Sequence, residues 1–425
     1  MTGALYLGLD FGTSGVRACL IDDEEHPVAE AQTPLPPPHR QDSRVSQDPE
    51  IWWQALDTLM NRLARDGAPL EQVARLAVDG TAATLLVTDD QGRPLAPALM
   101  YNDSSATTEA ARIAEIAPEE SPARGASSSL AKLLRLLDEH PDARHALHQA
   151  DWIAGRLTGR FGLSDENNAL KLGHDVVERR WPAWLNRLEL DPRLLPEVRP
   201  PGTPLAPLRP ELAQKWGLPE GTLVVAGTTD STAAVLATGV RETGQAVTVL
   251  GSTLVLKVLS PVPVFASRYG VYSHRLGELW LAGGASNSGG AALAAFFTPA
   301  EIEALTPKLR PERRTCLEYY PLPAPGERFP VADPGLPPRT CPRPRDDARF
   351  LQGLLEGIAR VECRGYRLLE ELGAPAPTEV VSIGGGARNP AWRVIRERML
   401  RLPVRTARHD QPAFGTARLA RREGP

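Results

Sequence analysis

One stretch near the N-terminus constrains this chain more than any other. Leu5 to Asp22 reads LYLGLDFGTSGVRACLID, in which an apolar run ends in a carboxylate, a turn of glycines and hydroxyls follows, and a second apolar run ends in another acid. This pattern predicts a β-hairpin. Residues 12–15 would let phosphate oxygens approach backbone N–H groups, and Asp10 suits a hydrated divalent cation. Taken alone, the stretch fits an ordinary turn equally well.

A related unit returns near the middle of the chain. Gln245 to Leu259, QAVTVLGSTLVLKVL, again has two apolar runs around a turn of small residues, Gly251 to Thr253, but it lacks the leading carboxylate. Two phosphate-sized turns on two similar hairpins predict a duplicated domain with a nucleotide between the copies.

Length and charge narrow the class of protein. A chain of 425 residues can hold two or three domains, and a formal charge of -4 gives no electrostatic footprint for nucleic acid or an anionic membrane. The four cysteines are widely scattered, which indicates neither a zinc site nor a disulfide framework. No signal peptide is visible, and glycines and an asparagine interrupt the uncharged stretch 279–300. We therefore expect a cytoplasmic protein without nucleic-acid or membrane partners, either a monomer or a homodimer.

Helix and strand patterns alternate along the first half. Asp48-Pro49-Glu50 predicts the start of a helix that continues to Leu63, and 73–78 predicts a short strand. Residues 30–40 look like a loop because they are rich in proline. The alternation favours an α/β sheet. A proline-dense segment, 199–210, precedes a fresh strand that begins at Thr222, so we expect the domain boundary there.

Polar segments follow several of these elements. Asp103 lies at the end of an apolar lead, where the simpler interpretation is a helix cap. Residues 162–171, GLSDENNALK, look like a solvated loop by composition. Asp230 follows a strand and precedes a helix pattern, a position that also suits an N-cap. Residues 283–290 suit either ligand contact or close helix packing. Gly384 to Gly386 follow a strand directly, and packing alone accounts poorly for such a run.

In this order the segments resemble the sugar kinases of the FGGY family, within the actin, Hsp70 and hexokinase superfamily of ATP-binding proteins. The resemblance runs from about Leu5 to about Ala420. It implies an α/β fold of two ribonuclease H-like (actin-like ATPase) domains with mixed central sheets flanked by helices, and an active site in the interdomain cleft. The domains would be 1–221, for sugar and phosphate binding, and 222–425, for the catalytic acid and the nucleotide. It also implies ATP and Mg²⁺ as cofactors and a small-molecule ketose as substrate.

The resemblance assigns roles residue by residue. Asp230 would be the general base that deprotonates the attacking sugar hydroxyl, and Asp10 with Asp230 would hold the metal. Residues implied to bind the substrate are Asp10, Asp79, Gly80, Thr81, Asp103 and Asp230. Residues implied to bind the cofactor are Gly12, Thr13, Ser14, Arg17, Gly251, Ser252, Thr253, Gly284, Gly384, Gly385, Gly386, Ala387 and Asn389.

The sugar is indicated by one departure from the family. Xylulose kinases commonly show S-G-Q-M-H-G at the sugar pocket, whereas the corresponding segment here, Asp79 to Thr84, reads DGTAAT. Losing an imidazole and a thioether changes the hydrogen bonding and shape of a pocket. The chain looks more like the compact D-ribulose kinases, so a D-ribulokinase is our first expectation and a D-xylulose kinase the second. Glycerol or hexulose kinases, a sugar-independent ATPase and a non-catalytic sugar sensor stay open.

Overall fold

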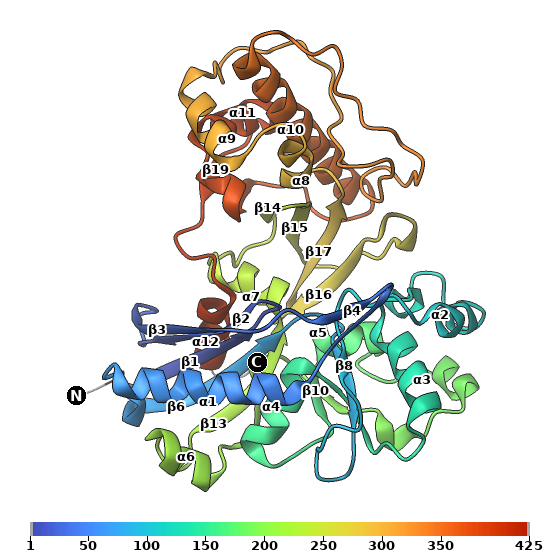
Figure 1. Ribbon diagram of the computed structural model, residues 1–425, viewed down its shortest axis with the longest axis vertical. Coiled ribbons are helices and arrows are strands. Elements are labelled where there is room, and N and C mark those ends of the chain that lie inside the picture. The colour runs from blue at the N-terminus through green and yellow to red at the C-terminus, as the bar shows by residue number, and fades with distance from the viewer. Residues whose placement is uncertain (1–2, 423–425) are drawn as a thin grey trace. The chain divides into compact units, whose positions relative to one another are not determined.

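The computed structural model describes residues 3–422, and its chain divides into two units (Figure 1). Unit 1 takes the residues up to Ala237 together with those from Gln411 onward. Unit 2 is the intervening part, Thr238–Asp410. Unit 2 is therefore inserted between two segments of unit 1.

The N-terminal hairpin forms as predicted and lies within the six-stranded sheet of unit 1. Strands β1, β6 and β13 of this sheet run parallel, whereas β1, β2 and β3 are joined antiparallel. In spatial order the sheet contains β12 (Pro204–Pro207), β13 (Leu223–Thr229), β6 (Val73–Gly80), β1 (Leu5–Phe11), β2 (Gly15–Ile21) and β3 (Pro27–Pro34).

Helices pack against this sheet. Helix α1 (Pro49–Arg65) begins as predicted, because the Asp48 side chain accepts the N–H of Glu50 and proline occupies the first turn. Helix α12 (Pro412–Arg421) packs against β1, β2, β6 and α7 (Asp230–Ala237). This contact needs glycine: a Cβ on Gly415 would lie 1.8 Å from the backbone oxygen of Ala233 in α7.

The rest of unit 1 forms smaller layers. A second sheet contains β4 (His39–Gln41), β5 (Arg44–Gln47), β8 (Ala98–Leu99), β7 (Leu85–Thr88) and β9 (His145–His148), and β10 (Leu163–Asp165) pairs with β11 (Glu197–Arg199). The helices are α2 (Thr107–Ala114), α3 (Ser129–Glu139), α4 (Gln149–Thr158), α5 (Glu166–Ala169) and α6 (Pro210–Trp216).

The loop expected at residues 30–40 is mostly strand. Strand β3 pairs with β2 from Gly15↔Pro34 to Ile21↔Pro27, and β4 follows. Prolines are tolerated here because β3 is the edge strand of its sheet.

Unit 2 has its own six-stranded sheet. In spatial order it contains β16 (Tyr272–Leu276), β17 (Leu279–Ser286), β15 (Leu254–Ser260), β14 (Gln245–Leu250), β18 (Glu379–Ile383) and β19 (Val404–Thr406). Its helices are α8 (Gly290–Ala294), α9 (Pro299–Leu305), the long α10 (Asp347–Glu371) and α11 (Pro390–Leu400). The core under the sheet includes the rings of Phe329, Phe350 and Trp392.

The expected duplication is confirmed by topology. In both sheets an antiparallel hairpin, β1–β2 or β14–β15, continues on one side into a third antiparallel strand. On the other side, two parallel strands follow: β6 and β13 in unit 1, β18 and β19 in unit 2.

The two units divide the chain differently from the boundary expected between residues 221 and 222. Strand β13 pairs with β6 and α7 follows it directly, so residues 222–237 belong to unit 1. Residues from Gln411 onward return to unit 1 because α12 packs on β1. The proline-dense segment 199–210 leads into β12 of the same sheet and separates nothing. Among residues 3–422, no helix combines the length and the apolar character that crossing a membrane requires.

Candidate active site

Three carboxyl groups of unit 1 lie at the ends of adjacent parallel strands. Asp10 in β1 is in register with Asp79 in β6, and Thr228 of β13 is also paired with Asp79. Asp230 begins α7 immediately after β13. Because the carboxyl ends of parallel strands meet at one edge of a sheet, the fold brings Asp10, Asp79 and Asp230 together there.

The two inner acids, Asp10 and Asp79, disfavour each other's charge. Asp79 is completely buried, and burial, together with the charge of Asp10, raises its pKa well above the usual range. Its Oδ2 accepts the hydroxyl of Thr416 from α12, while its Oδ1 has no hydrogen-bond partner among residues 3–422. Burial also raises the pKa of Asp10, although the Arg17 guanidinium, 3.0 Å from Asp10 Oδ2, opposes this shift. Two neighbouring carboxyl groups of this kind share a proton or require a cation.

Asp230 differs from these two acids in exposure. Its side chain is half-buried, and its Oδ1 accepts the N–H of Ser231. The charge of Asp230 contributes to the raised pKa of Asp79, which indicates that the two carboxyl groups lie close together. A set of oxygens with two buried carboxyl groups and a third at the rim fits a hard, partly hydrated cation such as Mg²⁺.

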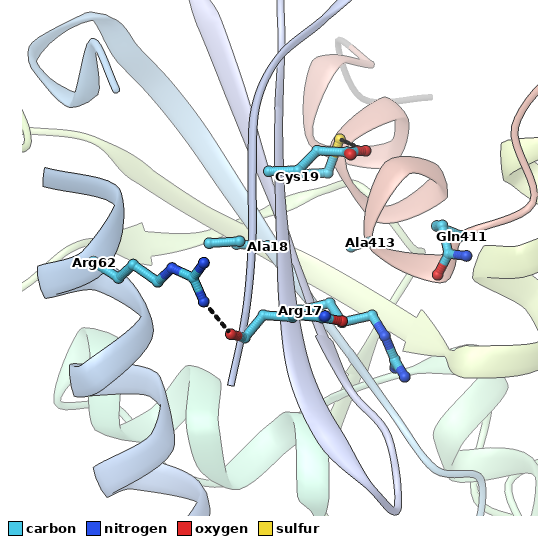
Figure 2. A pocket seen from close by; sticks show the side chains of 9 residues that line it. Arg17, Ala18, Cys19, Arg62, Gln411 and Ala413 are labelled. Atoms are coloured by element: carbon cyan, nitrogen blue, oxygen red, sulfur yellow. Dashed lines mark hydrogen bonds between the residues drawn. The ribbon is translucent and has the colours of Figure 1, made fainter. Parts of the chain in front are cut away.

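The turn after β1 is tight and open to solvent. The N–H of Gly12 donates to the backbone oxygen of Gly15 over 3.1 Å, Thr13 is half-buried and Ser14 is exposed. Arg17 lies just beyond, in β2, and borders a hollow of about 590 Å³. Figure 2 shows Arg17 and Gln411 on one side of β2, with Arg62 of α1 on the other side.

The segment after β6 is fixed by a residue that sequence reasoning missed. Gln149 Oε1, at the start of α4, accepts both the N–H and the hydroxyl of Thr81, over 3.0 and 2.9 Å. Gly80 allows this approach, since a Cβ there would lie 3.1 Å from Gln149 Oε1. Gln149 Nε2 is buried, and no acceptor in the described part of the chain reaches it. A glutamine far along the chain carries no local pattern, so only the fold reveals it.

The Asp103 carboxylate is engaged by neighbouring backbone and side-chain donors. Its Oδ2 accepts the N–H of Val45 over 2.7 Å, and its Oδ1 accepts the N–H and hydroxyl of Ser105. These bonds use most of the acceptor sites of one carboxylate. None of these bonds caps a helix, because α2 has Ala106 as its N-cap and no side-chain cap bond, so the helix-cap interpretation is wrong for Asp103. Its bonds to Val45 and Ser105 account for its burial without a sugar contact.

Lys132 is a second residue that the sequence did not single out. It is completely buried in α3, and its Nζ donates to the backbone oxygens of Ala83 and Met100, both over 2.7 Å. Burial lowers the pKa of Lys132 to about 7. These contacts join the segment after β6 to the segment before Asp103.

The polar segment 162–171 is not a solvated loop. Ser164, Asp165, Asn167 and Asn168 are each at most 3% exposed. The Asp165 side chain accepts the N–H groups of Asn167 and Asn168 and so caps α5, and Asn167 Nδ2 donates to Thr228 Oγ1 over 3.0 Å. The segment thus supports β13 two residues before Asp230.

The matching turn of unit 2 has a similar internal bond. The N–H of Gly251 donates to the backbone oxygen of Thr253 over 3.2 Å, and the backbone oxygen of Gly251 accepts the N–H of Gly290. Ser252 is exposed and Thr253 is half-buried.

A cavity of about 760 Å³ in unit 2 adjoins this turn. Gly385 and Gly386 form part of its wall, and a Cβ on Gly385 would meet no atom of the described chain within 4 Å. Gly384 turns the chain at φ 84°, a conformation suited to glycine. Asn389 caps α11 as predicted, with Oδ1 accepting the N–H of Trp392. Trp392 also borders the cavity, and its Nε1 finds no hydrogen-bond partner within residues 3–422.

The apolar lining of this cavity suits a flat ring. Apolar side chains on its walls are Leu293, Phe297, Ile302, Leu355 and Trp392. Two of the glycines expected to bind the cofactor, Gly385 and Gly386, line it, and so does Asn389. Such a concave, largely apolar pocket with few polar groups is typical of sites for small ligands.

Two residues expected to bind the cofactor serve the packing of unit 2. Gly284 is buried in β17, where a Cβ would lie 2.5 Å from the ring of Phe329, so close packing already requires this glycine. Ala387 is 8% exposed and belongs to the core of unit 2.

Comparison with known proteins identifies the family. Residues 5–237 match the N-terminal domain of the FGGY family of carbohydrate kinases, and residues 246–423 match its C-terminal domain. The chain belongs to the FGGY family of carbohydrate kinases. The resemblance expected from the sequence is thereby confirmed, and with it the class of enzyme: an ATP-dependent carbohydrate kinase.

Relatives of this FGGY kinase span nearly all of its length. A xylulose kinase of Escherichia coli (strain K12) is 28% identical over 440 residues, which cover 98% of this chain and 89% of that protein. A ribulokinase of Halalkalibacterium halodurans is 28% identical over 301 residues, covering 60% of this chain and 53% of that protein. The crystal structure of a xylulose kinase from Brucella ovis superimposes with a TM-score of 0.90 at 26% identity, covering 98% of this chain and 90% of that chain. The expected actin-like ATPase fold is likewise confirmed.

Proposed function

We propose that this FGGY kinase transfers the γ-phosphoryl group of ATP to the primary hydroxyl of a ketopentose, with D-ribulose as its substrate and D-ribulose 5-phosphate as its product. The observation that carries the proposal is the acid cluster of unit 1. Asp230 lies near two buried carboxyl groups, Asp10 and Asp79, and Asp79 Oδ1 has no hydrogen-bond donor within the described part of the protein. Phosphoryl transfer needs such an arrangement, because one acid must address the attacking alcohol and others must hold the cation that neutralises charge.

Asp230 would act as the general base. It stands at the start of α7 and is more exposed than Asp10 or Asp79, so a sugar hydroxyl can reach it from solvent. It would orient the primary hydroxyl and accept its proton as the oxygen attacks phosphorus. Asp10 and Asp230 would hold Mg²⁺, which when bound supplies compensation for the charge on the phosphate oxygens.

The phosphate turns and the cavity would bind ATP. In unit 1, Gly12 to Ser14 offer backbone N–H groups and hydroxyls to phosphate oxygens, and Arg17 adds a positive charge. In unit 2, Gly251 to Thr253 offer the same groups. The adjoining cavity of about 760 Å³ would bind the adenosine, with Trp392 Nε1, which has no partner among residues 3–422, as a donor to it.

The segment after β6 would bind the sugar and distinguish it from related sugars. Gln149 Nε2, which has no acceptor among residues 3–422, would donate to a sugar hydroxyl. Thr81 would orient this amide, because its N–H and hydroxyl donate to Gln149 Oε1, and Gly80 allows the close approach of Gln149. D-ribulose and D-xylulose differ in configuration at one carbon only, so a few polar contacts decide between them. D-xylulose is the second candidate, because relatives that span 98% of the chain carry the name xylulose kinase.

A substrate screen tests the sugar. ADP release would be measured with ATP and Mg²⁺ over D-ribulose, D-xylulose, L-ribulose, L-xylulose, glycerol and sedoheptulose. We expect the highest kcat/KM with D-ribulose and a product phosphorylated at the terminal carbon by NMR. A higher kcat/KM with D-xylulose would transfer the proposal to that sugar. ADP release that is independent of every sugar would overturn the kinase assignment.

A variant tests the base. Asp230→Ala should fold and bind ATP but lose sugar phosphorylation by roughly 10²- to 10⁴-fold, the usual worth of a general base. The control is Asp138→Ala, which removes an exposed acid of unit 1 and should leave turnover unchanged. Near-normal turnover by Asp230→Ala would remove Asp230 as the base while leaving the screen interpretable.

A further inference from the structure

A groove on unit 2 concentrates arginine side chains. It has a volume of about 1010 Å³ and is lined by residues of α10, of the end of α11 and of the long segment that precedes α10. Arginines that line it are Arg314, Arg339, Arg360, Arg364, Arg367 and Arg401, together with Arg398. The proposed kinase reaction uses none of these residues.

Three of the arginines share one face of a helix. Arg360, Arg364 and Arg367 lie four and three residues apart on α10, a spacing that stacks side chains on the same face. Arg360 is half-buried, and Arg364 and Arg367 are exposed. Their common orientation places several guanidinium groups along one wall of the groove.

Few of these charges are neutralised within the protein. Arg398 pairs with Glu356 over 2.8 Å, and Glu356 also accepts bonds from Thr315. Arg364 and Arg367, by contrast, make no ion pair within the described part of the chain. The lining also contains Glu318, Glu356 and Glu371, so seven arginines face three glutamates and the groove keeps an excess of positive charge.

The base of the groove also contains an unmet donor. Arg360 Nη2 donates to the backbone oxygen of Leu317 over 2.8 Å, but its Nε is buried and meets no acceptor from residues 3–422. A buried N–H of this kind is costly unless a ligand or water accepts it. An anion seated in the groove would satisfy it.

We propose that this groove binds a small anion that carries two or more phosphate groups. Repulsion between like charges at i,i+4 destabilises a helix, and a multivalent anion would reverse that effect. Guanidinium groups match phosphate oxygens in paired hydrogen bonds. The volume suits a metabolite-sized ligand, and the net charge of -4 disfavours a long nucleic acid. The proposal is independent of which sugar the kinase phosphorylates.

Calorimetric titration with inorganic tripolyphosphate at low ionic strength tests binding. Two double variants of equal charge change would be compared with the wild-type protein. Arg364→Glu with Arg367→Glu removes charge from the groove, whereas Arg345→Glu with Arg408→Glu removes it from positions outside the groove. We expect the groove variant to bind roughly tenfold more weakly or worse, and the control to bind like the wild type.

Cysteine labelling locates the ligand. Cys316 is exposed and lines the groove, and Cys341 is exposed but does not line it. Tripolyphosphate should slow maleimide modification of Cys316 and leave that of Cys341 unchanged, as measured by peptide mass spectrometry. The KM for ATP should be the same in the groove variant and the wild type, which separates the groove from the nucleotide cavity.

Three results would overturn the proposal. One is equal binding by the wild type and the groove variant, and another is an unchanged labelling rate at Cys316. The third is equal weakening in both double variants, because it would reduce the effect to net charge. Stronger protection of Cys316 by poly-glutamate or by a DNA duplex than by tripolyphosphate would replace the small anion with a macromolecular partner.

Discussion

The two sheets share one topology but place their charges differently. In unit 1 the paired residues before the turn are Asp10 and Asp79, whereas in unit 2 the corresponding pair is Val249 and Ile383. Each pair belongs to the central parallel strands, two residues before a glycine for Asp10 and Val249. The same scaffold therefore holds acids at its strand ends in one copy and branched apolar side chains in the other.

Unit 2 keeps its buried charge in the core instead. Glu362 of α10 and Arg396 of α11 form two hydrogen bonds, of 2.7 and 2.6 Å, with both side chains 1% exposed. Thr248 and Ser382 complete the network by bonding to Glu362 and Arg396. The two sites differ in hydrogen bonding rather than in burial. The Glu362 and Arg396 side chains are bonded to each other and to Thr248 and Ser382, while Asp79 Oδ1 of unit 1 has no partner among the described residues.

The largest effect is expected from a substitution that breaks the buried network of Glu362 and Arg396. Glu362→Gln should lower the free energy of unfolding by about 3–5 kcal/mol, because it leaves the buried Arg396 charge uncompensated. Chemical denaturation measures the change. The control is Asp347→Asn at the first residue of the same helix. It breaks an exposed pair with Arg343, which precedes the helix, and should cost less than about 1 kcal/mol. A cost no greater than that of the control would contradict the structural role of the network.

Lys132 is a buried ionisable group of unit 1 whose hydrogen-bond partners are defined. Lys132→Met should lower the free energy of unfolding by about 2–4 kcal/mol, since the backbone oxygens of Ala83 and Met100 lose their donor. The KM for the sugar should rise more than kcat falls, because these oxygens belong to the segments proposed to shape the sugar pocket. Lys215→Met, at an exposed pair with Asp57, is the control. Unchanged stability and KM would refute the positioning role.

Substitution of Asp79 should stabilise the protein, unlike the substitutions of Glu362 and Lys132. Burial and the charge of Asp10 raise the pKa of Asp79, so its carboxyl gives up a proton less readily in the folded chain than in the unfolded chain. Asp79→Asn is nearly isosteric and should raise the free energy of unfolding by about 1 kcal/mol. The gain should grow as the pH rises above about 4, because the unfolded carboxyl ionises there and the raised pKa then costs the wild type stability. Turnover should fall, because an amide cannot ionise to support a cation. Asp90→Asn, an exposed change, serves as control. A destabilised, fully active variant would show that Asp79 belongs with the hydrogen-bonded charges of unit 2.

The smallest expected effect is the pH dependence of stability that the buried His174 contributes. Burial lowers the pKa of His174 to about 4, so wild-type stability should decline as the pH falls from about 6.5 through 4, where the unfolded chain takes up the proton first. His174→Phe keeps the edge-to-face contact with Trp181 and should decline less over that range. Thermal unfolding across pH measures the difference, with the exposed His39→Gln as control. Parallel pH profiles for wild type and His174→Phe would exclude this contribution.

The sequence predicted local elements well because their signals are local. The hairpins at β1–β2 and β14–β15, the Asp48 cap of α1 and the Asn389 cap of α11 all follow from neighbouring residues. The acids at strand ends were also found, since each directly follows or ends an apolar run.

Partners from distant parts of the chain could not be predicted in this way. The contacts of Gln149 with Thr81 and of Thr416 with Asp79 join residues far apart in sequence, and no local sequence pattern predicts them. The prediction for segment 162–171 was wrong because its polar side chains bond to one another and to β13 rather than to water. The expected boundary between residues 221 and 222 differs from the division into two units, because a helix that follows unit 2 in sequence packs on the first strand.

Helix α12 has a consequence for how the protein is made. A ribosome delivers β1, β6 and β13 early, yet the helix that covers them and supplies Thr416 to Asp79 emerges only after the whole of unit 2. Until then one face of the first sheet lacks its cover, and the acid cluster lacks one of its donors. We therefore expect the first sheet to be completed only after translation has passed the inserted unit, and a chain interrupted within unit 2 to leave this face of the sheet uncovered.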